Sequence, residues 1–181
     1  MPSNAQDINS YAFSNSDRLL LDANVWMFVH GPNRPGDNRV AVYSGALAKI
    51  LAANSTIHTD VLIISEFINR YARLRHGILQ STAGAPADFK RFRNSADFKA
   101  VAQDIADAVR RVLKNCTRIE SDFESVDIAS LIDEYEKGRS DFNDQMLTEL
   151  CKSRGLTLVT DDGDFKGLGL SLITANNKLL S

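Results

Sequence analysis

The chain has 181 residues, of which 44% are hydrophobic and 24% charged, values typical of a globular protein with a substantial core. Its two cysteines are far apart and its three histidines form no ligand motif, which argues against a disulfide framework and a zinc site. The chain does not open like a signal peptide, and no apolar run reaches the roughly 20 residues that span a bilayer. We therefore expect one cytoplasmic domain that makes no membrane contact.

The net charge of −2 hides an uneven distribution along the sequence. Residues 70–118 contain eleven Lys and Arg against four Asp and Glu, a net charge of +7 that leaves −9 for the remainder. A basic region of this kind is typical of nucleic-acid binding, because contacts to phosphates release counterions. A solvated helix surface would account for the same charges.

Short apolar runs and helical periodicity alternate along the chain. Strands are expected over 18–22, 55–58, 117–120, 157–160 and 170–174. Helices are expected over 23–29, 39–53, 95–113, 124–136 and 141–154, and from a cap at Asp60 to Arg75. Glycines and prolines predict a loop at 31–36 and a turn-rich stretch at 77–86. Strands that alternate with helices predict an α/β fold with a parallel sheet and right-handed crossovers.

Acidic residues occur at four places that such a sheet would bring to one edge. They are Asp22 at a strand end, Glu66 near a helix start, Asp141 and Asp144 opening a helix, and Asp161, Asp162 and Asp164 after the strand 157–160. Parallel strands all end on the same edge, and a returning helix begins there, so these acids would share the crevice in which such folds bind ligands. Because like charges repel, gathered carboxylates need a cation, and oxygen ligands suit Mg²⁺ or Mn²⁺.

Most of these acids also have a simpler explanation. Asp22 can cap the helical turn that follows it, and Glu66 can pair with Arg70 at i, i+4. Asp141 suits an N-cap. Asp144 suits the first turn of a helix, although its side chain would also tilt toward the sheet edge. Taken together, the acids favour a metal-dependent enzyme that acts on phosphodiesters.

Four segments resemble those of the PIN-domain nucleases, a family that includes the VapC-type toxins. They are Leu21–Asn24, Ser65–Phe67, Asp141–Asp144 and Leu158–Phe165. The resemblance extends from Arg18 to about Thr174. It implies a three-layer α/β/α sandwich around a mostly parallel sheet, and an endoribonuclease that uses one or two Mg²⁺ or Mn²⁺ ions.

The resemblance also implies roles for individual residues. It places the catalytic, metal-binding acids at Asp22, Glu66, Asp144 and Asp162, and gives supporting roles to Asn24 and Thr160. Asp164 is a candidate outer ligand, and Asp141 stays a further candidate although the resemblance selects Asp144 over it. The resemblance further implies a homodimer and an antitoxin that covers the acidic crevice. Two features depart from the small VapC-type toxins: an N-terminal extension, residues 1–17, precedes the nuclease domain at 18–181, and the helical, basic middle segment at about 76–114 is longer.

The basic segment would guide an RNA substrate. Its candidate RNA-binding residues are Arg70, Arg73, Arg75, Arg91 and Arg93. Phe89 and Phe92 lie among Lys90, Arg91 and Arg93, an arrangement able to stack on a base, although both rings would also suit a core. The alternative to an enzyme is a catalytically silent PIN-like module that binds RNA or another protein.

Overall fold

The computed structural model describes residues 4–33, 36–138 and 141–181. The described residues form a six-stranded sheet in the order β1-β6-β5-β2-β3-β4, and every pairing is parallel. The strands are β1 (Asn4–Asp7), β2 (Arg18–Leu21), β3 (Thr56–Thr59), β4 (Thr117–Arg118), β5 (Thr157–Val159) and β6 (Ser171–Thr174). The predicted parallel α/β fold is confirmed.

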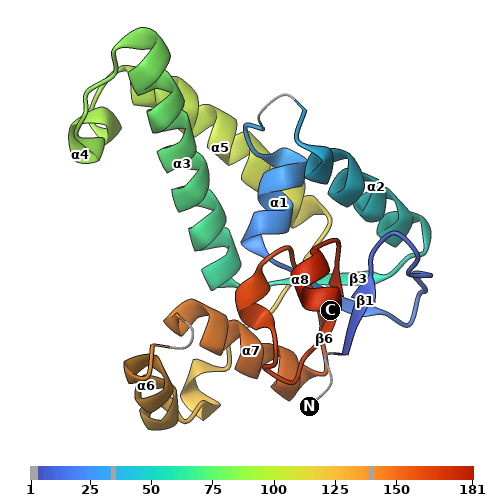
Figure 1. Ribbon diagram of the computed structural model, residues 1–181. Coiled ribbons are helices and arrows are strands. Elements are labelled where there is room, and N and C mark those ends of the chain that lie inside the picture. Colours follow the sequence, from blue (N-terminus) through green and yellow to red (C-terminus); the bar gives the residue numbers. More distant parts are fainter. Residues whose placement is uncertain (1–3, 34–35, 139–140) are drawn as a thin grey trace.

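Helices cover both faces of this sheet. They are α1 (Ala23–His30), α2 (Asn38–Ala52), α3 (Val61–Ala83), α4 (Phe89–Arg93), α5 (Asp97–Lys114), α6 (Ile128–Glu136), α7 (Phe142–Arg154) and α8 (Asn177–Leu180), with 3₁₀ turns η1 (Phe123–Ser125) and η2 (Gly163–Phe165). Helices α1, α2, α3 and α5 lie on one side of the sheet, and α6 and α7 lie on the other (Figure 1). The three-layer α/β/α arrangement is therefore present. None of the helices within the described ranges is long and apolar enough to cross a membrane.

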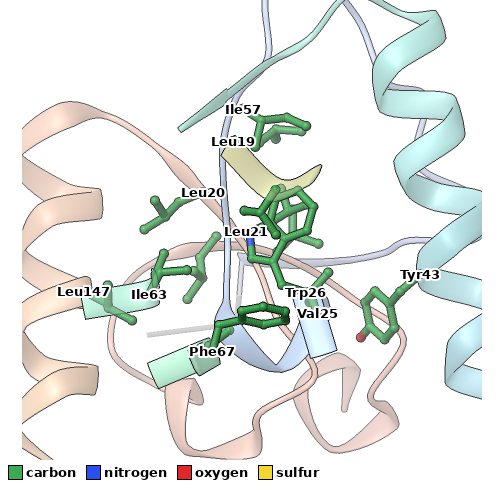
Figure 2. Packing of buried hydrophobic residues seen from close by; sticks show 14 of the residues in the cluster. Leu19, Leu20, Leu21, Val25, Trp26, Tyr43, Ile57, Ile63, Phe67 and Leu147 are labelled. Atoms are coloured by element: carbon green, nitrogen blue, oxygen red, sulfur yellow. The ribbon is translucent and has the colours of Figure 1, made fainter. Parts of the chain in front are cut away.

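The core is centred on β2, the apolar run Leu19, Leu20 and Leu21. All three side chains are buried, as expected of a central parallel strand that is covered on both faces. Figure 2 shows them among buried side chains from helices of both layers, including Trp26 of α1 and Leu147 of α7. This packing fixes the position of the residue that follows the strand, Asp22.

Aspartates start most of the helices. Their side chains accept a backbone N–H two or three residues later, at the N-caps Asp37, Asp60, Asp88, Asp127 and Asp141. A carboxylate in this position satisfies one of the N–H groups that a helix leaves unpaired at its start. The predicted caps at Asp60 and Asp141 are confirmed.

Several elements differ from expectation. The first strand, β1, precedes the first expected element and pairs with β6 at the sheet edge. It was missed because its sequence, Asn-Ala-Gln-Asp, is polar and only half-buried, so backbone pairing alone defines it. Helix α8 and the short α4 were also not expected. The predicted loop at 31–36 includes Pro35, which lies outside the described residues.

The turn-rich stretch predicted at 77–86 is wrong over most of its length. Helix α3 continues through Gly77 and ends only at Gly84, whose positive φ of 67° closes the helix in the left-handed conformation that glycine favours. The helix continues because His76 is buried against Phe92 and thereby anchors this part of α3 to α4. Tertiary packing here overrides the breaking tendency of a single glycine.

Candidate active site

The carboxyl ends of β2 and β5 lie side by side at the middle of the sheet. Leu21 pairs with Val159, which brings Asp22 next to Thr160, and the Asp22 N–H donates to the Val159 carbonyl at 3.0 Å. The strand order reverses at this point, because β3 lies on one side of β2 whereas β5 lies on the other. Open α/β sheets bind their ligands at such a switch point.

The Asp22 carboxylate is held by two polar neighbours. Its Oδ2 accepts hydrogen bonds from the Asn24 side-chain amide at 2.5 Å and from Thr160 Oγ1 at 2.7 Å. Thr160 Oγ1 in turn accepts the backbone N–H of Asp162 at 3.0 Å. Asp22 precedes α1, yet its side chain makes no capping bond like those of the other aspartates. The side chain is therefore oriented by Asn24 and Thr160, the two residues expected to support it, rather than by the helix.

Burial and nearby acids disfavour the charged form of Asp22. The residue is only 4% exposed, and its pKa is raised to about 6, first by burial and then by the charges of Glu66 and Asp162. The hydrogen bond from Thr160 acts in the opposite direction, because it stabilises the carboxylate. Asp22 thus lies in a negative field, to which Glu66 and Asp162 both contribute.

Asp144 reaches the same site from the opposite layer. The Arg18 side chain donates to the carbonyl of Arg154 at 2.8 Å, which fixes the end of α7 at the start of β2 and leaves its beginning at the carboxyl edge. Burial and the charge of Asp141 raise the pKa of Asp144 to about 7, and the charges of Asp22, Asp162 and Glu66 add to the shift. We call the four predicted catalytic acids, Asp22, Glu66, Asp144 and Asp162, the acidic edge.

Glu66 and Asp141 show the simpler interactions considered for them. Glu66 forms an ion pair with Arg70 at 2.8 Å, and Asp141 accepts the Asp144 N–H at 2.9 Å as the N-cap of α7. Both still contribute to the field of the site, since the charge of each raises the pKa of Asp144. A structural role and a place in the site are compatible for these two residues.

The aspartates that follow β5 differ in their surroundings. Asp162 accepts the N–H of Asp164 at 3.1 Å, and Asp164 itself is exposed. Asp161 is engaged by α2: its carboxylate lies 2.8 Å from the Tyr43 hydroxyl and 3.5 Å from the Arg39 guanidinium. Of these three acids, only Asp162 affects the pKa values of both Asp22 and Asp144.

The loop that carries these acids is held by residues that the sequence did not single out. The hydroxyl of buried Tyr43 lies 3.2 Å from the Thr160 carbonyl and accepts the N–H of Ala175 at 3.1 Å, in addition to its bond with Asp161. The Asn176 amide donates to the Asp161 carbonyl at 2.7 Å. Tyr43 lies within the expected helix 39–53, and no spacing or motif signals a bond to a loop more than a hundred residues later.

The donors at the acidic edge have the chemistry of a hard-cation site. They are carboxylate oxygens, and burial together with the repulsion of neighbouring acids raises the pKa values of Asp22 and Asp144. A divalent cation would relieve that repulsion. Within the described ranges, however, no three His, Cys, Asp or Glu side chains are grouped closely enough to hold a metal ion. The acids therefore influence one another's pKa values, but they are not grouped as a set of metal ligands within the described residues.

The predicted RNA-binding arginines fall into three settings. Arg70 pairs with Glu66, whereas Arg75 lies 3.7 Å from Asp104 of α5. Arg73 places its guanidinium 4.9 Å from the centre of the Phe89 ring. The other two, Arg91 and Arg93, are exposed on α4.

Comparison with known proteins identifies the family. No curated protein matches the chain. A family model described as the PIN domain matches residues 19–170, a span that contains the whole acidic edge. PIN domains are generally metal-dependent nucleases that use divalent ions. Since the match covers most of the sequence and the chain has the expected three-layer sandwich, this protein belongs to the PIN-domain family.

Proposed function

We propose that this protein is a cytoplasmic endoribonuclease that hydrolyses RNA phosphodiester bonds with the help of one or two Mg²⁺ or Mn²⁺ ions. The observation that carries the proposal is electrostatic. Burial and the charge of Asp141 raise the pKa of Asp144 to about 7, and the charges of Asp22, Asp162 and Glu66 add to the shift. Asp144 and these last three acids come from four separate parts of the chain. Their convergence at the switch point of the sheet suits cation binding better than any structural role.

The acidic edge would hold the cation, with Asp141 and Asp164 as outer candidates. A bound divalent ion neutralises charge on the phosphate and lowers the pKa of water nearby. The protein's own part is positional: Asn24 and Thr160 hold Asp22 Oδ2, and the Thr160 hydroxyl also fixes the backbone of Asp162. Asp22 and Asp162 are thus linked through Thr160 before any ion arrives, and the chemistry requires no His or Cys nucleophile.

The basic residues of α3 and α4 would bind the RNA backbone. The candidates are Arg70, Arg73, Arg75, Arg91 and Arg93, and the net charge of +7 over residues 70–118 supports this role. The resemblance to VapC-type toxins supports two finer proposals, namely that the protein forms a homodimer and that an antitoxin covers its acidic crevice.

A second candidate is a catalytically silent PIN-like module that binds RNA or another protein. The observation in its favour is that no three acidic, His or Cys side chains among the described residues are grouped tightly enough for metal binding. Under this alternative, the acidic edge would not support cleavage of RNA, whether or not it binds a cation.

Cleavage of a mixed pool of structured and single-stranded RNA distinguishes the two candidates. The wild type is compared with Asp22→Asn in Mn²⁺, Mg²⁺ or EDTA, and Asp133→Asn, a change of the same kind at an exposed position on α6, is the matched control. We expect metal-dependent cutting by the wild type and the control, and none by Asp22→Asn. Metal binding by calorimetry without any cutting would favour the silent module, and equal cutting by Asp22→Asn would show that the site assignment is wrong.

A further inference from the structure

The distal part of the basic segment forms a small helical unit away from the sheet. Helix α3 projects from the sheet edge, and α4 lies beside its far part, distant from the strands (Figure 1). The unit has its own aromatic core: the ring of fully buried Phe92 lies 4.8 Å from that of His76 and 5.4 Å from that of Phe98. We call this unit, residues 73–99, the arm.

The surface of the arm contains an open pocket of about 490 Å³. It is lined by Phe89, Lys90, Arg93, Asn94 and Phe98. The two phenylalanines are half-buried, whereas the two basic residues are exposed and make no ion pair with any described residue. Accessible aromatic surface beside unpaired cations is the combination with which proteins bind single-stranded nucleic acids.

One face of α3 connects this pocket with the acidic edge. Glu66, Arg70 and Arg73 follow one another at i, i+4 and i+7, so their side chains lie along the same face of the helix. The stripe starts at the acidic edge and ends where the Arg73 guanidinium packs on the ring of Phe89. Its two arginines therefore mark a positively charged path from the acids to the pocket.

The length of this path follows from helix geometry. His76, whose ring packs on Phe89 at 5.4 Å, comes ten residues after Glu66, which corresponds to about 15 Å along the helix axis. A stacked nucleic-acid strand advances about 3.4 Å per nucleotide, so about four or five nucleotides would span the distance. At this stacked spacing, an RNA of two or three nucleotides at the acids would not reach the pocket.

We propose that the arm pocket is a second RNA subsite, which takes one unstacked base of a single strand against Phe89 and Phe98 and the adjoining phosphates on Lys90 and Arg93. The proposal rests on the function proposed above and adds to it a substrate feature, a single-stranded stretch beside the scissile bond. A base stacked on an aromatic ring adds affinity with little regard to sequence. RNA affinity should therefore rise sharply once the strand is long enough to reach the arm.

The test measures RNA binding to the 181-residue protein with the Asp22→Asn change, which we expect to bind RNA without cutting it. Fluorescence anisotropy with single strands of about three and about twelve nucleotides gives affinity on either side of the expected threshold. Two variants alter the pocket in this background: Phe89→Leu keeps an apolar side chain but removes the ring, and Arg93→Ala removes a cation. The control, Arg110→Ala, removes a charge that lies on α5 outside the pocket and is paired with Asp107.

We expect the longer RNA to bind at least about tenfold more tightly than the shorter one, and Phe89→Leu to remove most of that gain. Arg93→Ala should weaken binding of the longer RNA and reduce the slope of log affinity against log salt by about 0.7. Neither Phe89→Leu nor Arg93→Ala should change the affinity for the shorter RNA. The control, Arg110→Ala, should change the affinity for neither RNA.

Unchanged affinity and salt slope in Arg93→Ala would overturn the subsite, and this holds even if Phe89→Leu disturbs the arm, because Arg93 is exposed. Metal-dependent cutting of the longer RNA by the wild type, measured in a parallel assay, would then leave the proposed function standing. If neither RNA is bound and the wild type cuts none, both proposals are wrong.

Discussion

The acidic edge and the arm are built in opposite ways. The acids come from four distant parts of the sequence and meet only because the sheet places strand ends and helix starts on one side. The arm is assembled from residues close in sequence, which pack on one another through Phe92 and His76. Like charges repel in the first region, whereas aromatic packing stabilises the second. The comparison indicates that the edge depends on contacts between distant parts of the sequence, while the arm depends on contacts between nearby ones.

The largest expected effect is on catalysis, where mutations in the acidic edge and in the arm should change different kinetic constants. Asp144→Asn should lower kcat/KM for RNA cleavage by about 10³-fold, the scale observed when a key electrostatic group is removed from an active site. Arg93→Ala should instead raise KM and leave kcat nearly unchanged, because it lies outside the site of chemistry. Initial rates in Mn²⁺ over a range of RNA concentrations measure both. A loss of kcat in Arg93→Ala equal to that in Asp144→Asn would contradict the division between the regions.

Stability should respond to Asp22→Asn in the opposite direction from activity. The folded-state pKa of Asp22, about 6, lies above the ordinary Asp value of about 3.9, so the folded state holds the proton more tightly than the unfolded state. This contribution is fully present below about pH 4 and is lost as the pH rises through 6. Asp22→Asn should therefore raise the free energy of unfolding by about 2–3 kcal/mol at pH 8 and change it little at pH 4.

Urea unfolding in EDTA at the two pH values measures the difference. Adding Mn²⁺ should stabilise the wild type at pH 8 and narrow the gap, because the cation binds only the folded site. An equal effect of Asp22→Asn at both pH values would mean that burial and the neighbouring acids do not raise the pKa of Asp22 in the folded state.

The sequence allowed the acidic edge to be predicted more completely than the arm. Strand ends can be predicted from apolar runs such as Leu19–Leu21, and the parallel topology then determines which acids lie close together. The length of α3 could not be predicted from the sequence. The helix continues through Gly77 because residues such as Phe92 pack on it from elsewhere in the chain. Strand β1 was missed for a similar reason, since its polar residues are defined by pairing with β6.

The sequence indicated which acids lie near one another, but it did not indicate the hydrogen bonds that hold the loop after β5. Asn24 and Thr160 lie next to strand ends in sequence, so the family resemblance could assign them. Tyr43 lies in a helix and reaches Asp161 only through the tertiary fold. A hydrogen bond between residues this far apart leaves no periodic signal in a single sequence.

Tyr43→Phe should show how strongly the edge depends on this restraint. The change removes a buried hydroxyl that bonds with the Asp161 carboxylate and the Ala175 N–H, so we expect a loss of about 1–2 kcal/mol of stability. Metal affinity should fall as well, because the loop that carries Asp162 becomes less fixed. Tyr11→Phe is the matched control: its hydroxyl donates to Asp17 at 3.1 Å, and its loss should affect stability alone. Identical metal affinity in both variants would show that Tyr43 does not position the loop for metal binding.

The smallest expected effect concerns the residue pair at which the two regions join. Glu66 belongs to the acidic edge and Arg70 to the stripe that leads to the arm, and their exposed i, i+4 ion pair contributes only about 0.2–0.5 kcal/mol. Arg70→Ala should therefore hardly change unfolding in urea. It should nevertheless act on the two regions in opposite directions, raising metal affinity because Glu66 no longer has a competing partner, and lowering RNA affinity because a cation is lost from the path. If the affinities for metal and for RNA both fall, Arg70 holds Glu66 in position for the metal and does not compete with the metal for Glu66. Arg70 would then belong functionally to the acidic edge.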